Sequence, residues 1–256
     1  MKIKKFGGFR IAYREGTADE LVLGYSFDDD IFFSGVPEYS PRPKDTIIDI
    51  GAHIGTFSIL AASRAMQGRV YAVEAGRENF EYLKKNIALN NLSNIFISNL
   101  ALTDSKGTVR LYYPQDGGTW GYTIAKEVSG EYEEVEADTL ASFMKDNNIL
   151  CCNFMKLNCE GAEYKIILST PRQILQRIKI LLVLYHSDIV GEHSEDALIK
   201  HLKDSGFSIT IRERTKERGW IIAGKTAAFS SLGRIINSFR FKARWKIRFF
   251  KKKWFK

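Results

Sequence analysis

The stretch that most constrains the fold runs from Asp45 to Gly55 and reads Asp-Thr-Ile-Ile-Asp-Ile-Gly-Ala-His-Ile-Gly. It begins as a short, mainly β-branched apolar run with one acid, Asp49, which is typical of a buried parallel strand. Gly51 and Gly55 then bracket a turn, and apolar residues resume at helical spacing from Phe57. Strand, glycine turn and helix is how an α/β protein presents backbone to a nucleotide-like ligand, because a Cβ would hold the ligand away.

The spacing Asp-x-Gly-x-x-x-Gly is not the dinucleotide fingerprint Gly-x-Gly-x-x-Gly. The next apolar run, Val70 to Ala75, strengthens the nucleotide interpretation because it ends in one acid, Glu74. In βαβ units an acid at the tip of the second strand can accept hydrogen bonds from a ribose diol. The alternative is a solvated acid at a strand end. We favour the ribose role, since the glycine turn lies one βα unit upstream.

These two stretches resemble motifs one and two of class I S-adenosylmethionine-dependent methyltransferases, and the wider pattern resembles the FkbM family. The resemblance covers roughly residues 17 to 187. Three further stretches carry it: Asn99-Leu100-Ala101-Leu102-Thr103-Asp104, Asp138-Thr139-Leu140, and Phe154-Met155-Lys156-Leu157-Asn158-Cys159-Glu160-Gly161-Ala162-Glu163. The chain departs from the family at Asn158, where Asp is usual, which bears on any role that needs a charge there.

The resemblance implies an α/β fold with a Rossmann-like class I methyltransferase sheet, mostly parallel, of seven strands with a C-terminal antiparallel hairpin. It also implies S-adenosylmethionine as cofactor. The cofactor-binding residues that it implies are Asp49, Gly51, Gly55, Glu74, Asn99 and Ala101. For Asp49 a purely structural hydrogen bond to the turn is an equal alternative. His53, inside the turn, is interpreted as a turn residue and not as a catalyst.

The hydrophobic periodicity predicts the same class of sheet from the residues alone. Strands are expected at 45–50, 69–75, 94–98, 152–157 and 180–185, and helices at 54–66, 78–91, 139–147, from 162, and 194–204. Such alternation implies a parallel sheet with helices on both faces. Two further strands at 108–113 and 132–136 interrupt it, and 207–212 with 220–223 would end the sheet as a hairpin.

Methyl transfer to an alcohol needs an acceptor for the departing proton. Glu160, after the strand that ends at Leu157, and His186, after the strand that ends at Tyr185, are the two candidates. The structural alternatives are a helix-capping acid for Glu160 and a satisfied loop histidine for His186. Trp120 and Tyr122 in a Gly-rich loop could stack on a sugar or anchor the loop. Some sugar and catechol methyltransferases use Mg²⁺ held by carboxylates and amide oxygens, but Asn158 in place of the usual Asp counts against this alternative, and no metal site is predicted.

We therefore expect an O-methyltransferase acting on a hydroxyl of a sugar or glycan, such as a glycolipid or polysaccharide. The expected domains are a cover segment at 1–44, a methyltransferase domain at 45–228 and a basic aromatic tail at 229–256. The N-terminus lacks the apolar stretch of a signal peptide, and the longest apolar run is too short to span a bilayer. Three cysteines form neither a disulfide framework nor a zinc spacing, which favours the cytoplasm.

The formal net charge of +8 belongs to the tail, because residues 234–256 hold ten Lys or Arg and no acid. Without these ten, 28 basic residues face 30 acidic ones. Residues 239–249 alternate apolar and basic side chains, which on an extended chain separates an apolar face from a cationic one. This pattern suits an anionic membrane surface, at the inner face of the membrane. The alternative is a nucleic-acid-binding protein or a nucleic-acid methyltransferase that uses the same tail.

Overall fold

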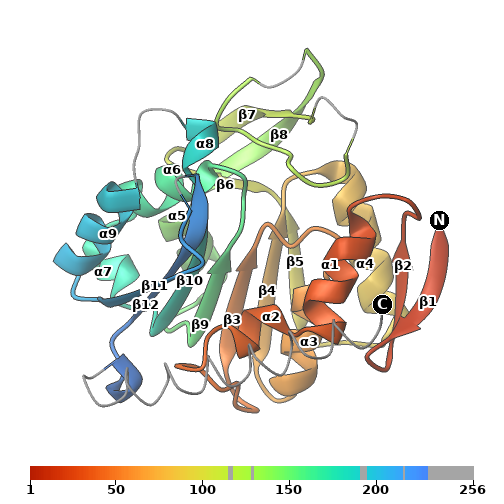
Figure 1. The fold of residues 1–256 in the computed structure, drawn as a ribbon, viewed down its shortest axis with the longest axis horizontal. Coiled ribbons are helices and arrows are strands. Elements are labelled where there is room, and N and C mark those ends of the chain that lie inside the picture. The colour runs from red at the N-terminus through yellow and green to blue at the C-terminus, as the bar shows by residue number, and fades with distance from the viewer. Residues whose placement is uncertain (115–117, 128–129, 191–194, 216, 230–256) are drawn as a thin grey trace.

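The structure is a computed structural model that describes residues 1–114, 118–127, 130–190, 195–215 and 217–229. Its centre is a seven-stranded sheet in the order β11-β12-β10-β9-β3-β4-β5 (Figure 1). The strands are β3 (Thr46–Ile50), β4 (Arg69–Glu74), β5 (Ile95–Asn99), β9 (Phe154–Leu157), β10 (Ile180–His186), β11 (Ser208–Arg212) and β12 (Arg218–Gly224). The five from β10 to β5 run parallel, and β12 runs antiparallel to both β10 and β11. This is the predicted mostly parallel sheet with a C-terminal antiparallel hairpin.

Apart from Asp49, successive residues of β3 from Ile47 to Ile50 are apolar, because both faces of the strand are covered. Ile48 and Ile50 pack into one hydrophobic cluster, and Ile47 packs into another on the opposite face. All three are at most 3% exposed, as expected for a parallel strand in the middle of a sheet. Asp49 is paired in register with Lys156 of the neighbouring β9, which brings two charged side chains together inside the sheet.

Helices cover both faces of the sheet, as the βα alternation predicts. On one face lie α5 (Leu140–Asp146), α6 (Ala162–Ser169), α7 (Arg172–Leu175) and α9 (Glu195–Asp204). On the other lie α2 (Ile31–Ser34), α3 (Thr56–Arg64) and α4 (Arg77–Leu89). The short helices α8 (Ser187–Val190) and η2 (Ala227–Phe229, a 3₁₀ turn) follow β10 and β12.

A second, three-stranded sheet stands beyond the carboxyl ends of the main strands, at the top of Figure 1. It consists of β6 (Ala101–Thr103), β7 (Gly107–Tyr112) and β8 (Tyr132–Thr139). The strands predicted at 108–113 and 132–136 are confirmed as the antiparallel pair β7 and β8. β6 was not predicted, because a run of three residues is too short for its periodicity to be seen.

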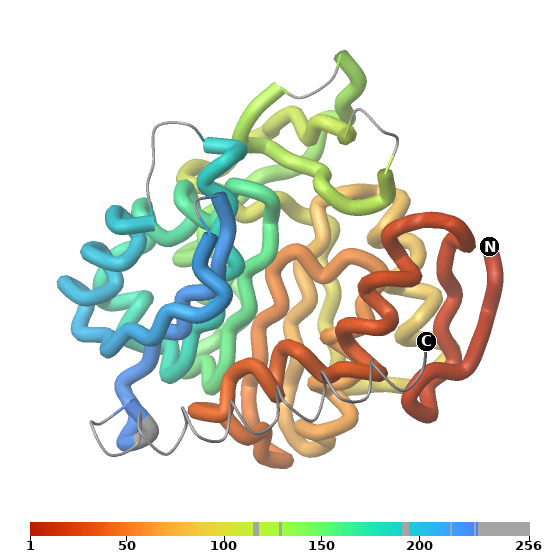
Figure 2. Tube along the Cα trace, viewed as in Figure 1, coloured from red at the N-terminus to blue at the C-terminus, as the bar shows by residue number. Residues whose placement is uncertain are grey.

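The N-terminal segment lies against α3 and α4 and forms the red edge of Figure 2. It contains β1 (Lys2–Phe6), β2 (Phe9–Tyr13), α1 (Asp19–Leu23) and a π-helical turn η1 (Gly24–Asp28) before α2. Asn86 of α4 holds β2 in place, since its amide exchanges hydrogen bonds with the backbone of Ala12 at 2.7 and 3.0 Å. β1 is rich in lysine and largely exposed.

Residues 234–256, which carry the predicted membrane tail, lie outside the described part of the chain. In the part that the structure describes, no helix is both long and apolar enough to cross a membrane.

Candidate active site

A cavity of about 630 Å³ opens at the carboxyl ends of the parallel strands. Gly51 lines it after β3, Glu74 at the end of β4, Asn158 after β9, and His186 at the end of β10. Ligands of open α/β sheets gather at this edge, where several strands deliver side chains to one place. The cavity therefore lies where the sequence places the ligand, and its volume is that of a small-molecule site.

The sequence suggests that Gly51 and Gly55 leave room for a ligand, but the structure gives another reason for these glycines. Gly51 and Gly55 both adopt left-handed backbone conformations, with φ of 75° and 87°. A Cβ on Gly51 would overlap the carbonyl oxygen of Asn158, and one on Gly55 would press into Leu83. The expectation that a Cβ would chiefly obstruct the ligand is thus corrected, because at these positions it would first meet the protein itself.

Glu74 binds the backbone of the turn with both of its carboxylate oxygens. Oε2 accepts from the amide of His53 at 2.7 Å, and Oε1 accepts from the amide of Gly76 at 2.9 Å. Burial raises the pKa of this carboxyl, and the two amides oppose that rise. Each ionised oxygen has a further lone pair. Glu74 lines the cavity, so it can accept hydrogen bonds from a ligand while it holds the turn.

Asn99 and Ala101, the two cofactor-binding residues predicted at and after the end of β5, have different places in the structure. Ala101 lines the cavity together with its neighbours Leu100 and Leu102. The side chain of Asn99 is used elsewhere, because its Nδ2 donates to the carbonyl oxygens of Glu74 and Ala75 at 2.9 and 2.8 Å. Asn99 thus braces the end of β4 and is not among the residues of the cavity wall.

Asp49 is fully buried, and both of its oxygens are bound by the protein. Oδ2 accepts from the Ser58 hydroxyl at 2.6 Å, and Oδ1 accepts from Lys156 Nζ at 2.7 Å. Lys156 Nζ also donates to the carbonyl oxygen of Gly51 at 3.0 Å. In its structural role Asp49 therefore contacts the turn through Lys156. Asp49 binds the Lys156 ammonium group, and the same ammonium group binds the backbone of the turn at Gly51. Sequence reasoning missed Lys156, although a lysine inside the apolar run of β9 was a visible signal.

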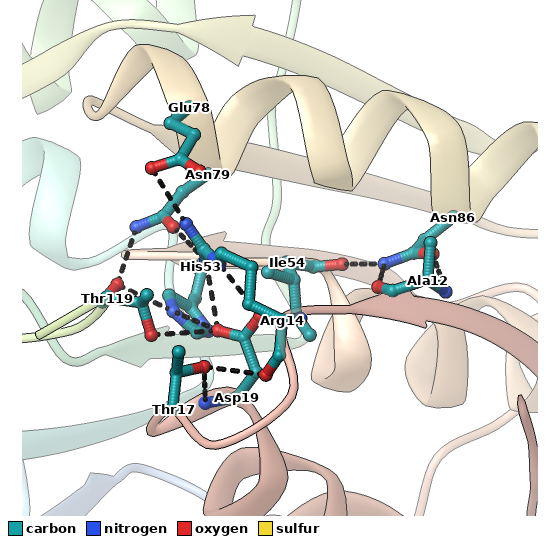
Figure 3. A network of polar contacts seen from close by, with 10 residues as sticks. All are labelled: Ala12, Arg14, Thr17, Asp19, His53, Ile54, Glu78, Asn79, Asn86 and Thr119. Carbon is teal, nitrogen blue, oxygen red and sulfur yellow. Dashed lines mark hydrogen bonds and ion pairs between the residues drawn. The ribbon is translucent and has the colours of Figure 1, made fainter. Parts of the chain in front are cut away.

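His53 belongs to a polar network that joins the glycine turn to two other segments (Figure 3). Its Nε2 lies 2.8 Å from the carbonyl oxygen of Thr119, which can only accept, so Nε2 carries the proton. Burial lowers the pKa of His53 to about 4, which keeps the ring neutral. Asn79 Nδ2 donates to the same carbonyl at 3.1 Å. His53 is therefore a turn residue, as predicted, and it anchors the inserted loop, the segment 118–127 between β7 and β8.

Asp19 is the centre of this network and is 0% exposed. Its carboxylate accepts four hydrogen bonds: from the Arg14 amide at 2.8 Å, from Arg14 Nε and Nη2 at 2.9 Å, and from the Thr119 hydroxyl at 2.9 Å. Arg14 Nη2 also donates to Asn79 Oδ1 at 2.6 Å. The N-terminal segment and the inserted loop, far apart in sequence, are thus locked together above the glycine turn.

Glu160 and His186, proposed from the sequence as rivals, lie side by side on the cavity wall. His186 Nε2 is 3.6 Å from Glu160 Oε2, and His186 Nδ1 is 3.2 Å from Glu163 Oε1. Glu163 is fully buried and also accepts from the amides of Cys159 and Gly161, at 2.6 and 2.8 Å. The structure therefore brings both catalytic candidates together, and Glu163 contacts the second nitrogen of the same imidazole ring.

The two carboxylates set the charge of the imidazole. Burial alone would lower the pKa of His186, but Glu163 and Glu160 outweigh it and raise the pKa to about 8. Burial also raises the pKa of Glu160, and its backbone has a left-handed φ of 49°. Such strain in a non-glycine residue is common at functional sites, where the surrounding structure holds it in place. At neutral pH the imidazole of His186 is therefore mostly in its protonated form.

Comparison with known proteins decides the family. A family model described as the methyltransferase FkbM domain matches residues 49–209, which is more than half of the chain. The chain belongs to the FkbM methyltransferase family. Its predicted class, a methyltransferase that depends on S-adenosylmethionine, is confirmed by this membership. Asn158, where the family usually carries Asp, lies in the wall of this enzyme's cavity.

Two relatives of this FkbM methyltransferase agree with the assignment. It is similar to methyltransferase sdnD of Sordaria araneosa, with 25% identity over 201 residues, 66% of this chain and 76% of that protein. Its fold is similar to the crystal structure of a methyltransferase FkbM from Methylobacillus flagellatus KT, with a TM-score of 0.50 and 17% identity. That alignment covers 75% of this chain and 46% of the other, so this chain spans less than half of that protein's length.

The FkbM family model covers the glycine turn, Glu74, Glu160 and His186, but not the N-terminal segment that completes the cavity. Val22, Tyr25, Ile31 and Phe32 of that segment line the wall. No signal in the sequence predicts their place, because the contacts join residues far apart in the chain. Among the described residues, no group of His, Cys, Asp and Glu side chains has the arrangement of a metal site.

Proposed function

We infer that this FkbM-family enzyme transfers a methyl group from S-adenosylmethionine to a hydroxyl of a sugar or glycan, such as a glycolipid or polysaccharide. The observation that carries this proposal is the Glu160–His186–Glu163 cluster, in which Glu160 and His186 line the same cavity as the glycine turn and Glu74. Alcohol methylation needs an acceptor for the hydroxyl proton, and this cluster supplies one.

Parts of the cavity wall suit S-adenosylmethionine. Glu74 offers acceptor lone pairs for a ribose diol, and the turn from Gly51 to His53 and Ala101 line the same wall. When bound, the cofactor supplies an electrophilic methyl group on its sulfonium. The volume of about 630 Å³ suits a molecule of that size together with part of an acceptor.

Glu160 is proposed as the base. At neutral pH, His186 holds its extra proton between two carboxylates, and Glu163 is occupied by two backbone amides. Glu160 is then the carboxylate of the cluster that reaches the cavity, and its raised pKa makes it a stronger base than an exposed glutamate. His186 positions Glu160 and stabilises its charge. As the acceptor oxygen takes the methyl group, the bond between that carbon and the sulfonium sulfur would break, the cofactor would leave as the neutral thioether, and the hydroxyl proton would pass to a Glu160 oxygen.

Aromatic side chains support a sugar or a similarly sized acceptor. Trp120 and Tyr122 of the inserted loop and Trp220 of β12 all line the cavity. Trp120 is 41% exposed, so its ring can still bury a ligand face. Indole and phenol rings offer flat apolar surfaces with polar edges, which suits the C–H face of a pyranose between its hydroxyls.

Two measurements test the proposal. Isothermal titration calorimetry measures the binding of S-adenosylmethionine to the full chain, and absence of binding would refute it. Transfer from methyl-labelled S-adenosylmethionine is then assayed on sugars, glycolipids, polysaccharides and nucleic acids, and mass spectrometry locates the methyl group. We expect a base-stable methyl ether on a carbohydrate. Label recovered in nucleic acid would favour the alternative of a nucleic-acid methyltransferase.

The role of Glu160 is tested with the acceptor found in that assay. We expect Glu160→Gln to lower kcat by about 10²- to 10⁴-fold, the range of a lost general base, with unchanged affinity for S-adenosylmethionine. Glu136→Gln, on an exposed position of β8 outside the cavity wall, is the matched control and should keep the full rate. A full rate in Glu160→Gln and a large loss in His186→Gln would assign the base to His186 instead.

We also propose, from the sequence alone, that residues 234–256 bring the enzyme to an anionic membrane surface and so to lipid-linked glycans. The support is their ten basic residues, their lack of acids and their interleaved aromatic side chains. Each basic residue near such a surface contributes roughly 1 kcal/mol, and Trp favours the headgroup zone. Nucleic acid is the competing partner of the same charges.

A further inference from the structure

Lys156 has one hydrogen-bond donor more than the protein uses. The residue is 3% exposed, and its Nζ donates to Asp49 Oδ1 at 2.7 Å and to the carbonyl oxygen of Gly51 at 3.0 Å. An ammonium group carries three N–H donors, so one remains after these two bonds. Lys156 and Gly51 both line the cavity. The remaining donor is therefore held at the cavity wall.

The surroundings of Lys156 make this donor strong. Its Nζ lies 5.4 Å from the centre of the Phe32 ring and 5.8 Å from that of Phe57, and both rings line the cavity. Apolar rings keep water away, and a charged hydrogen bond is stronger where water is excluded. Asp49 is fully buried and is not in the cavity wall. Its two carboxylate oxygens are bound by Ser58 and Lys156. Asp49 is thereby placed to hold the Lys156 ammonium group in position.

The start of α3 adds a second feature that favours negative charge on the same wall. Thr56 and Phe57, its first two residues, line the cavity. The first N–H groups of a helix have no partner within the helix and carry a partial positive charge. An anionic ligand group between Lys156 and this helix start would meet favourable charge from both sides, whereas an ammonium group would be repelled.

We propose that Lys156 binds the carboxylate of the methionine part of S-adenosylmethionine, and that Asp49 acts as the positioning residue for Lys156. The proposal rests on the proposed function, because it takes S-adenosylmethionine as the ligand of this cavity. That carboxylate is the one anionic group of the molecule. The competing role for Lys156 is purely structural: it neutralises Asp49, and the Phe32 and Phe57 rings satisfy its third donor.

A pair of ligands separates the two roles. Decarboxylated S-adenosylmethionine keeps the ammonium, the sulfonium, the ribose and the adenine, and lacks only the carboxylate. We expect the wild-type chain to bind S-adenosylmethionine about 10- to 100-fold more tightly in calorimetry, the size of one charged hydrogen bond. In Lys156→Met this preference should fall to within about threefold, while the affinity for the decarboxylated ligand stays close to wild type.

Lys156→Met leaves the buried Asp49 charge without a partner, so a second variant guards against misfolding. Asp49→Asn combined with Lys156→Gln keeps hydrogen-bonding groups at both positions and removes both charges, and it should also lose the preference. Ser58→Ala is the matched control, because it removes the other hydrogen bond of Asp49 and leaves Lys156 in place. It should keep the preference.

The outcomes distinguish this inference from the proposed function. If the wild-type chain binds neither ligand, the proposed function fails. If it binds both with equal affinity, or if the folded variants keep the wild-type preference, the carboxylate is not bound by Lys156 and the inference is overturned. A variant that weakens both ligands by the same factor would show that Lys156 is structural, and would equally overturn it.

Discussion

Replacing Asp19 by Asn should destabilise the protein more than any exposed charge substitution. Asp19 is 0% exposed, and three of the four hydrogen bonds to its carboxylate come from Arg14, whose side chain is 11% exposed. Removing one partner of a buried ion pair costs about 3–5 kcal/mol. Arg14 retains Asn79 at 2.6 Å and Glu78 at 3.1 Å, so the loss should lie at the lower end, about 3 kcal/mol.

The magnitude can be read as a shift in melting temperature. Chains of 150–250 residues lose about 2–4 °C per kcal/mol, so Asp19→Asn should lower Tm by about 6–12 °C in differential scanning calorimetry. The matched control is Asp204→Asn, which breaks the exposed ion pair between Lys200 and Asp204 on α9. Exposed pairs of this spacing contribute little to stability because water screens them, which predicts a shift of less than about 2 °C.

The pH dependence gives an independent check. Burial raises the pKa of Asp19, but the bonds from Arg14 and the nearby positive charges outweigh it and lower the pKa below its usual value. A lowered carboxyl pKa contributes stability above the unfolded value, near 3.9, and this stability is lost as pH falls through the folded value. The Tm difference between wild type and Asp19→Asn should therefore be constant from about pH 5 to 8 and shrink below about pH 4. Equal Tm shifts for Asp19→Asn and Asp204→Asn at pH 7 would refute the reasoning.

Three further predictions concern the site and the tail. NMR titration of His186 should give a pKa of about 8, which Glu160→Gln should lower because it removes one carboxylate; an unchanged value would contradict their contact. Gly51→Ala should destabilise the fold by about 1–3 kcal/mol in urea unfolding with no ligand present, since its Cβ would overlap the Asn158 carbonyl, whereas Gly130→Ala meets no neighbouring atom and should be neutral. The full chain should sediment with anionic vesicles and not with neutral ones, and a chain that ends at residue 233 should sediment with neither; equal sedimentation of both would remove the membrane role, and stronger retention on single-stranded nucleic acid would favour that partner.

The sheet could be predicted from the sequence because its signals are local. The run Ile47–Ile50 is apolar apart from Asp49, and in the structure both faces of that strand are buried. The turn after it needs left-handed backbone at Gly51 and Gly55, and only glycine adopts that freely. Even so, the reason for Gly51 was misread, since the atom that excludes a Cβ belongs to Asn158, more than a hundred positions later.

The candidate site could be predicted only in part, because it is made of contacts between distant segments. Glu160 and His186 were found singly, from their places at strand ends, but nothing local shows that they meet at 3.6 Å. The network of Asp19, His53 and Thr119 has the same origin, since it joins three segments that the chain separates widely. Sequence periodicity indicates which face of an element is buried, and not which charged side chain a buried charge will find.

One short stretch, residues 154–163, connects the two halves of the cavity through the need of buried charges for partners. Lys156 is paired with Asp49 and so faces the glycine turn, where the cofactor is proposed to bind. Four residues later, Glu160 lies next to Nε2 of His186, and Glu163 lies next to Nδ1 of the same imidazole. An uncompensated buried charge is costly, so each of these pairs fixes the position of the strand end that carries it. A shift of β9 against β3 or β10 would break a pair on one side, and the proposed methyl donor and proton acceptor are thereby held in a fixed relation by the fold itself.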